Sequence, residues 1–244
     1  MDLLLEDKVV VITGGTKGIG LAITESFCKE GAKVIVGSRT RRNLDRNIDY
    51  YYLDVSNKQS CIDFFNYVID KYKKIDVLVN NAGIMKDRST KKMTDSEFDD
   101  VINTNLKGTF NMVRLIGPLM QNNGYGSIIN ISSCVVRFGN YGQANYVASK
   151  AGIEGMSKCW AKEFSSHGEN VRVNVIAPGI VLTDIFKDTS LETINMFSKK
   201  TALGRLAKAE EIANIVLFLA SEVSSYITGS IIHADGGGID YWSK

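Results

Sequence analysis

Short apolar runs alternate along the chain with longer segments in which apolar residues recur at helical spacing. The runs occupy residues 8–12, 33–37, 50–53, 76–80, 127–133 and 171–176, with a last one near Ile231. Runs of about four to eight apolar residues without polar alternation are typical of strands buried on both faces of a parallel sheet. The pattern therefore predicts an α/β chain.

Helical spacing follows most of these runs. The first predicted helix begins at the turn after the first run and continues through Phe27. Four other predicted helices cover residues 58–73, 96–121, 145–166 and 210–219. Gly31 is expected to end the first helix, and Pro118 is expected to bend or end the helix at 96–121, because proline removes a backbone hydrogen bond. Too few residues separate Arg39 from Asp54 for a loop, a full helix and a strand, so we expect a shortened crossover there.

Composition narrows the function classes. A chain of 244 residues with 44% hydrophobic content can bury a full core, and it shows no repeat, low-complexity tract or linker that would divide it. Its 29 basic and 27 acidic residues leave a formal charge of only +2, and no run of like charge exceeds residues 39–42. We therefore expect one domain and no nucleic-acid partner.

The chain also lacks the patterns of metal sites and membrane segments. The four cysteines are far apart without a Cys-x-x-Cys motif, and only two histidines could join them: Cys28, Cys61, Cys134, Cys159, His167 and His233. Acidic residues flank the apolar triplet near the N-terminus, and no stretch reaches the ~18 apolar residues of a membrane span. The expected protein is cytoplasmic, with reduced thiols, no metal and no membrane partner.

A glycine-rich turn follows the first predicted strand. Gly14, Gly18 and Gly20 have the spacing G-x-x-x-G-x-G and open the first predicted helix. Glycines allow the backbone to approach a pyrophosphate, and the helix N-terminus offers it free N–H groups and a positive dipole end. A plain tight turn is the alternative, but the position between strand and helix favours a dinucleotide site.

The end of the second predicted strand bears on the choice of dinucleotide. An acidic residue there would hydrogen-bond the ribose 2′-OH of NAD, whereas this chain has Ser38 and Arg39. The small side chain of Ser38 leaves room for the 2′-phosphate of NADP, and the Arg39 cation could bind it. The alternative is a solvated loop arginine.

Tyr146 and Lys150 are four positions apart at the start of an apolar predicted helix, so they share one helix face. A cation beside a phenol favours the phenolate, and it could bring Tyr146 within range of proton transfer near neutral pH. The pair would then be a general acid/base. For an isolated pair, the commoner arrangement is a ring packed under a solvated amine.

Three motifs occur in order on this chain: Thr13-Gly14-x-x-x-Gly18-Ile19-Gly20, Asn80-Asn81-Ala82-Gly83 and Tyr146-x-x-x-Lys150. In this order and spacing they resemble the short-chain dehydrogenase/reductase family over essentially the whole chain. Residues 81–84 with Asp87 and Met93, residues 143–146 and residues 226–229 look most like its 3-oxoacyl-[acyl-carrier-protein] reductases. The resemblance implies a Rossmann-type, doubly wound sheet of seven parallel strands in a single domain over residues 1–244.

The resemblance also implies a catalytic tetrad of Asn105, Ser133, Tyr146 and Lys150. Tyr146 would be the acid/base, and Lys150 would lower its pKa and bind the nicotinamide ribose. Ser133 would hydrogen-bond the substrate oxygen, and Asn105 would hold a water for a proton relay to Lys150. Taken alone, Ser133 could equally cap local backbone and Asn105 could be a helix-face amide.

Cofactor-binding positions follow from the same resemblance. The pyrophosphate turn would comprise Gly14, Thr16, Lys17, Gly18, Ile19 and Gly20. Adenine would contact Asp54 and Val55, the ribose would lie beside Asn81, Ala82 and Gly83, and Pro178, Gly179, Ile180 and Thr183 would clamp the carboxamide. Tyr146 and Lys150 would also touch the cofactor. Family members that prefer NADP(H) carry basic residues at the two positions that Lys17 and Arg39 occupy here. Ser38 directly precedes Arg39 and would also contact the cofactor.

The implied function is NADPH-dependent reduction of a ketone to a secondary alcohol, in a homotetramer. The substrate would be a small carbonyl or alcohol compound, including acyl thioesters, covered by residues 185–203 with Phe186, Met196 and Phe197. One alternative is a dehydrogenase for a free acyl-CoA, sugar, polyol or hydroxysteroid. The other is an NADP(H)-binding protein without turnover, against which the intact tetrad argues.

The chain departs from the branch it most resembles at two positions. Carrier-protein reductases typically present basic residues just before the fifth strand and just after the helix with the catalytic tyrosine. Here the first place holds Gly124, and the second region holds His167 and Glu169. Three nearby cations could supply the missing charge: Lys158, Lys162 and Arg172.

Overall fold

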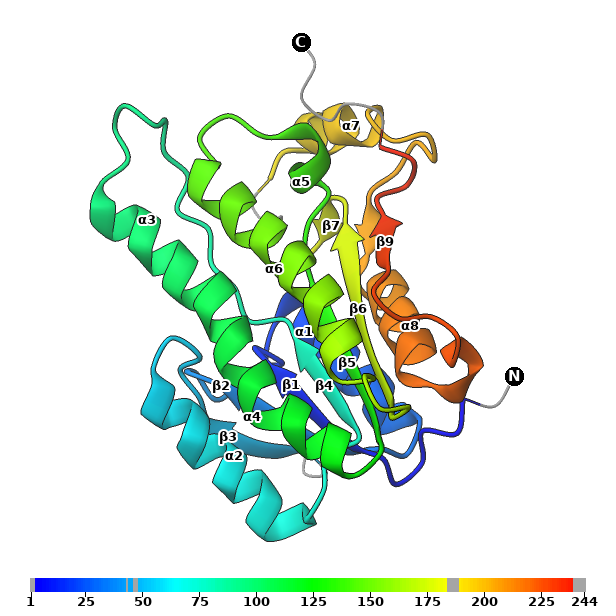
Figure 1. The fold of residues 1–244 in the computed structure, drawn as a ribbon. Helices are drawn as coiled ribbons and strands as arrows, with labels where there is room; N and C mark the ends of the chain where they lie inside the picture. The colour runs from blue at the N-terminus through cyan, green and yellow to red at the C-terminus, as the bar shows by residue number, and fades with distance from the viewer. Residues whose placement is uncertain (1–2, 43, 46–47, 184–188, 239–244) are drawn as a thin grey trace.

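Seven parallel strands form one sheet in the order β3-β2-β1-β4-β5-β6-β9 in the computed structural model, which describes residues 3–42, 44–45, 48–183 and 189–238 (Figure 1). The predicted doubly wound α/β fold is confirmed. The strands are β1 (Val9–Thr13), β2 (Lys33–Ser38), β3 (Asp49–Tyr52), β4 (Val77–Asn80), β5 (Tyr125–Ile131), β6 (Asn170–Pro178) and β9 (Ile231–Ala234). A separate parallel pair joins β7 (Val181–Leu182) to β8 (Ala207–Lys208).

Helices cover both faces of the sheet. One face packs against α1 (Gly18–Lys29) and α8 (Ala209–Ala220), and the other against α2 (Lys58–Tyr72), α4 (Gly108–Asn122) and α6 (Ala144–Glu163) (Figure 1). The remaining helical segments are α3 (Asp95–Val101), the π-helical η1 (Ile102–Lys107), α5 (Val135–Phe138), α7 (Leu191–Ser198) and the 3₁₀ turn η3 (Glu222–Ser224).

The central strand shows why the apolar runs are continuous. Val10 and Ile12 of β1 join the core beneath α1 and α8, while Val9 and Val11 join the core beneath α2 and α4. Both faces of a parallel sheet are covered by crossover helices, so successive residues are buried on opposite sides. Burial on both faces removes the polar positions that would alternate along a half-exposed strand.

The helix predicted at 96–121 runs from Asp95 to Asn122 as α3, η1 and α4. Thr94 and Glu97 form a capping box at its start. Of the two expected effects of Pro118, an end to the helix is not found, because α4 continues past it to Asn122, and a bend stays a prediction. Ile116 and Met120 are fully buried on either side of Pro118, and their packing offsets the hydrogen bond that proline removes.

Two segments were expected to be irregular, the connection between β2 and β3 and the segment at 185–203. Between β2 and β3 the described residues contain no helix, which confirms the shortened crossover. The segment at 185–203 contains the short helix α7, whose first turn is capped by Ser190 accepting from the Thr193 N–H. Phe186 lies outside the described residues, whereas Met196 is exposed on α7. None of the described helices combines the length and apolar composition that a bilayer crossing requires.

Candidate active site

The sequence-predicted site residues gather at the carboxyl edge of the sheet. The glycine turn follows β1, Asn81 follows β4, Ser133 follows β5 and Gly179 follows β6. The strand order reverses direction between β1 and β4, and ligands of open α/β sheets bind in the crevice at such a switch point. Figure 1 shows this edge at the end of the molecule where α5 and α7 lie.

The turn after β1 is a cradle that only glycine can form. Gly14 and Gly18 have φ angles of +68° and +54°. A Cβ on Gly20 would lie 2.3 Å from the Gly14 carbonyl oxygen and 2.5 Å from Asn81 Nδ2. Helix α1 begins at Gly18 with neither a side-chain cap nor an acidic residue in its first turn. The turn therefore fits a pyrophosphate, whose oxygens would accept from the free N–H groups.

The cradle is tied to the end of β4 by two side chains. Asn81 Nδ2 donates to the Thr13 and Gly14 carbonyl oxygens, at 3.2 and 3.0 Å. Thr13 Oγ1 in turn accepts from the N–H groups of Asn81 and Ala82, both at 3.1 Å. Thr13 belongs to the glycine-turn motif of the sequence, but its hydrogen bonds to the end of β4 were not predicted.

The residues expected to choose the cofactor lie at one end of the cradle. Ser38 is buried, with its hydroxyl 3.4 Å from that of Thr16 and donating to the Thr40 carbonyl at 2.7 Å. Lys17 and Arg39 are both exposed. Neither forms an ion pair within the described part of the chain. Both cations are therefore available to a ligand.

The other cofactor positions border the same crevice. Thr183 lies against the cradle, since a Cβ on Gly18 would be 3.5 Å from its methyl carbon. The Pro178 carbonyl accepts from the Cys134 N–H at 2.8 Å, which joins the end of β6 to the segment after β5. At the adenine end, Asp54 accepts from the Ser56 hydroxyl at 2.6 Å. The expected clamp and adenine contacts thus lie on either side of the glycine turn.

Tyr146 lies on the first turn of α6, half-buried in a small apolar cluster with Ile180. Burial raises the pKa of its phenol to about 12, and a hydrogen bond with Ser133 acts in the opposite direction. The phenol is therefore protonated at neutral pH. Lys150 has its Nζ 5.6 Å from the ring centroid and donates to the Ile131 carbonyl at 2.7 Å. The Ser133 hydrogen bond acts to lower the Tyr146 pKa, and the expected lowering by Lys150 stays a prediction.

Asn105 lies in the π-helical turn and is fully buried. Its Oδ1 accepts from the Ile84 N–H at 2.8 Å, and its Nδ2 donates to the Ile84 carbonyl at 3.0 Å and to Ser149 Oγ at 3.1 Å. Thr109 Oγ1 donates to its main-chain oxygen. Both Nδ2 hydrogens are thus used by protein groups, whereas Oδ1 has two lone pairs and one partner. The expected water stays a prediction. Ser149, which holds this amide, was missed from the sequence.

Gly83 keeps the space between Asn105 and Lys150 open. A Cβ at Gly83 would lie 3.3 Å from Asn105 Oδ1 and 3.7 Å from Lys150 Nζ. All four candidate catalytic residues are therefore brought to one region beside the glycine turn. The geometry allows proton transfer at the Tyr146 oxygen with Ser133 in hydrogen-bond reach.

Lys150 is 4% exposed, and burial lowers its pKa to about 8. Replacing Lys150 with Met is expected to raise the free energy of unfolding at pH 7 by roughly 1 to 3 kcal/mol, after allowing for the lost hydrogen bond. The cost of the buried charge is fully present below the folded pKa and disappears as the pH rises toward the ordinary lysine value. Urea denaturation of both proteins at pH 7 and pH 10 measures this. An advantage of Met that is absent at pH 7, or equal at both values, contradicts the prediction.

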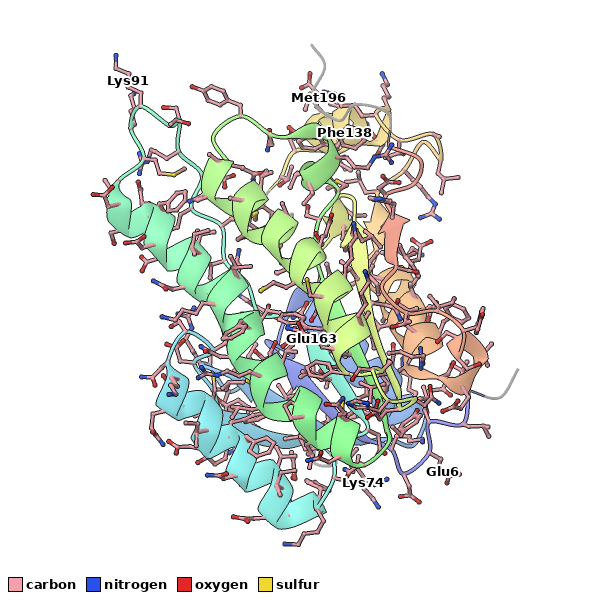
Figure 2. The ribbon with its side chains drawn as sticks, viewed as in Figure 1. Glu6, Lys74, Lys91, Phe138, Glu163 and Met196 are labelled. Atoms are coloured by element: carbon pink, nitrogen blue, oxygen red, sulfur yellow. The ribbon has the colours of Figure 1, made fainter. Side chains whose placement is uncertain are left out.

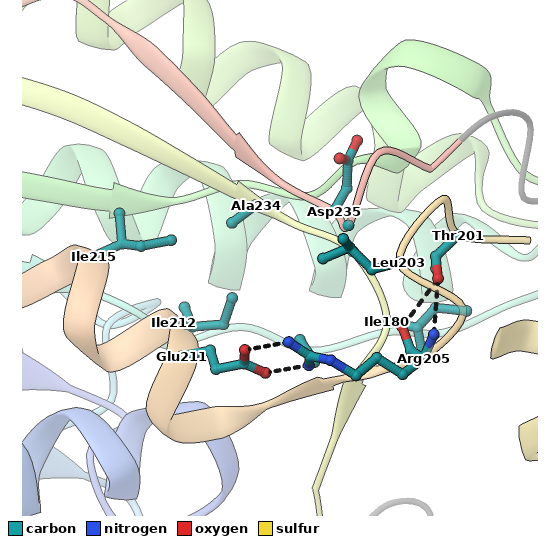
Figure 3. Close-up of a pocket in the computed structure, with 12 residues that line it drawn as sticks. Ile180, Thr201, Leu203, Arg205, Glu211, Ile212, Ile215, Ala234 and Asp235 are labelled. Carbon is teal, nitrogen blue, oxygen red and sulfur yellow. Dashed lines mark hydrogen bonds and ion pairs between the residues drawn. The ribbon is translucent and has the colours of Figure 1, made fainter.

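A cavity of about 200 Å³ lies behind the clamp, between the end of β6 and α8 (Figure 3). Ile180 and Ile212 line it, and Arg205 closes it with a bidentate ion pair to Glu211, both N–O distances being 2.7 Å. No member of the candidate tetrad is among its lining residues. The cavity therefore borders the clamp residues Gly179 and Ile180 and does not contain the candidate catalytic groups.

Comparison with known proteins gives a consistent picture. Residues 14–238 match the family model described as "Enoyl-(Acyl carrier protein) reductase". The 3-oxoacyl-[acyl-carrier-protein] reductase FabG of Thermotoga maritima is 44% identical over 243 residues, which are 96% of this chain and 98% of that protein. The proteins of the same name from Salmonella typhimurium and Escherichia coli are each 40% identical over 240 residues, or 95% of this chain and 97% of theirs.

Proposed function

Since the chain belongs to the short-chain dehydrogenase/reductase family, we propose that it reduces the 3-keto group of acyl thioesters with NADPH. It is an oxidoreductase acting on CH–OH groups and is most like 3-oxoacyl-[acyl-carrier-protein] reductases. The observation that carries the proposal is the protonated phenol of Tyr146 with Ser133 beside it, next to a glycine cradle built for a pyrophosphate.

The residues of the crevice fit a nicotinamide dinucleotide. The glycine turn would hold the pyrophosphate, Ser38 and Arg39 the adenosine ribose, and Lys150 the nicotinamide ribose. Bound NADPH would supply a hydride to the substrate carbonyl carbon. The cradle and the uncapped start of α1 support this assignment.

Tyr146 would donate its proton to the substrate oxygen as charge develops there. A pKa near 12 keeps the phenol protonated at neutral pH, which is the form that a reductase needs in its acid. The reverse reaction would need the phenolate. The same side chain would serve as acid in one direction and as base in the other, so its pKa does not choose between reduction and oxidation.

Ser133 would steady the developing negative charge by donating a hydrogen bond to the same oxygen. Its position two residues beyond β5 places its hydroxyl next to the Tyr146 phenol. Fixed donors aimed at a developing oxyanion are usually among the largest contributions to catalysis. Asn105 would support the relay that returns a proton to Lys150 and then to Tyr146.

Consumption of NADPH tests the proposal. The purified protein is mixed with NADPH and a panel of 3-oxoacyl thioesters, β-ketoesters, sugars and ketosteroids, and absorbance at the NADPH band is followed. Rapid loss with 3-oxoacyl compounds supports the proposed reaction. Faster turnover of a sugar or steroid would show that the substrate belongs to that class instead. NADPH binding without consumption in the presence of any of the compounds would favour a binding protein.

An open groove lies at the start of α6, the helix that carries Tyr146. The groove is about 510 Å³ and is lined by Ser89, Thr90, Gly139, Asn140, Tyr141, Gly142, Ala144, Val147 and Ala148. Phe138 and Met196 lie at the same end of the molecule (Figure 2). We propose that the thioester arm enters here and that residues 185–203 cover the substrate. The homotetramer, the single domain and the cytoplasmic location remain predictions.

The charge expected for an acidic carrier is largely missing at the two departures from the branch, which lie at the amino ends of β5 and β6. Gly124 has no side chain, and Glu169 accepts from the His167 N–H and stays anionic because these hydrogen bonds lower its pKa. Arg172, which the sequence offered as a substitute, is buried and donates to the carbonyls of Leu219 and Ser221. It therefore cannot reach a partner.

We expect acetoacetyl-CoA to be reduced with a kcat/KM at least equal to that for the acetoacetyl carrier protein. Complementary charge mainly sets encounter rate, so its absence weakens docking without harming the chemistry. The two substrates are compared at low and high salt. His167→Lys should raise kcat/KM for the carrier substrate alone. A strong, salt-sensitive preference of the unmodified protein for the carrier contradicts the prediction.

A further inference from the structure

One face of α6 holds three consecutive residues at the end of β5 and just beyond it, Asn130, Ile131 and Ser132. Lys150 Nζ donates to the Ile131 carbonyl at 2.7 Å. One turn further, a Glu154 carboxylate oxygen accepts from Ser132 Oγ at 2.7 Å. Asn130 Nδ2 then donates to Ser157 Oγ at 2.9 Å. Positions 150, 154 and 157 share one helix face, so α6 fixes the chain just before Ser133.

Ser132 is the last of these fixed residues. Its N–H donates to the Ile176 carbonyl of β6 at 2.7 Å, and it is 3% exposed. The main chain therefore holds it from one side and Glu154 holds its hydroxyl from the other. The next side chain is that of Ser133, and the Cys134 N–H is bound again to the Pro178 carbonyl. The direction of Ser133 is thus set by how firmly Ser132 and Cys134 are held.

We propose that Glu154 is a positioning residue for the reduction, and that it acts through Ser132 to aim the Ser133 hydroxyl at the substrate oxygen. The inference rests on the proposed reductase function and adds to it a residue outside the candidate tetrad. A small misplacement of a group near the reacting atoms can cost as much as about 10²-fold in rate.

Glu154 positions Ser132 by accepting a hydrogen bond and not through its negative charge. Lys150 is the nearest ionisable residue along the same helix face, and burial alone accounts for the lowering of its pKa. Glu154 therefore does not act by stabilising the ammonium. A glutamine at this position keeps an oxygen that can accept from Ser132 Oγ, whereas alanine removes it.

The test compares Glu154→Ala, Glu154→Gln and Ser132→Ala in the full chain. We expect Glu154→Ala to lower kcat about ten-fold while the NADPH Kd and the melting temperature change little, in keeping with a loss of orientation. Ser132→Ala should have a similar effect, and the double Ala variant should lose no more than either alone, because both break one hydrogen bond. Glu154→Gln should recover most of the rate. Glu163→Ala, at the exposed end of α6, is the matched control and should match the unmodified protein (Figure 2).

Amide hydrogen exchange of residues 133–135 gives a readout that does not depend on turnover. It should be faster in Glu154→Ala and normal in Glu154→Gln. An unchanged kcat in Glu154→Ala, a parallel loss of kcat, NADPH affinity and melting temperature, or no recovery in Glu154→Gln overturns the proposal. If the unmodified protein consumes no NADPH with any substrate, the proposed function fails instead, and the exchange rates still decide whether Glu154 orders Ser133.

Discussion

Tyr146→Phe is expected to lower kcat by about 10² to 10⁴-fold, the usual contribution of a positioned general acid. The change removes only the phenolic oxygen, which in the proposed reaction donates the proton. The ring stays in its apolar cluster with Ile180, so the fold and the NADPH Kd should change little. Steady-state rates with acetoacetyl-CoA and NADPH, together with cofactor binding by fluorescence, measure both quantities.

Tyr226→Phe is the matched control, because Tyr226 is fully exposed and should tolerate the same change without effect. Retention of more than about a tenth of kcat by Tyr146→Phe, a loss under ~1.4 kcal/mol in activation free energy, would show that the phenol is not the acid. A large loss of NADPH affinity would instead assign Tyr146 a role in binding.

The strands were predictable because burial on both faces leaves a local signature. Val9 to Ile12 point to both cores in turn, and the sequence shows this as an unbroken apolar run. The glycine turn was predictable for the same reason, since positive φ angles at Gly14 and Gly18 demand a residue type that is visible in the sequence. Where the physical requirement is local, the residues reveal it.

The π-helical turn at η1 was not predictable, because its cause lies elsewhere in the chain. Asn105 is held by Ile84 and Ser149, which are 21 and 44 residues away. These contacts favour a wider helical turn that no local propensity marks. The roles of Thr13, Ser149 and Glu154 were not predictable for the same reason, since their partners become neighbours only when the strands pair and α6 packs on β5.

The electrostatics of the candidate site also depend on packing. The spacing of Tyr146 and Lys150 was read correctly as one helix face, but it could not show that the Lys150 ammonium turns to the Ile131 carbonyl. Arg172 looked like a surface cation, yet it satisfies carbonyls at the opposite edge of the sheet. Charge counted along a sequence carries no information on burial, and burial decides which charges a partner meets.

The second large effect concerns the cofactor: kcat/KM is expected to be at least about ten-fold higher with NADPH than with NADH. Lys17 and Arg39 are exposed beside the cradle, and charge-assisted hydrogen bonds to a 2′-phosphate contribute roughly 1.5 to 3 kcal/mol each. Ser38 adds no negative charge that would repel the phosphate. The preference should weaken at high salt, because both cations are exposed to screening.

Ser38→Asp combined with Arg39→Ala should erase or reverse this preference. The new carboxylate would repel the 2′-phosphate of NADPH and could accept from the ribose 2′-OH of NADH, while the loss of Arg39 removes one cation. Lys17→Ala should lower kcat/KM for NADPH and leave that for NADH nearly unchanged. Lys29→Ala removes the same charge at the far end of α1 and should have no effect. Equal kcat/KM for both cofactors in the unmodified protein would show that Lys17 and Arg39 are ordinary solvated side chains.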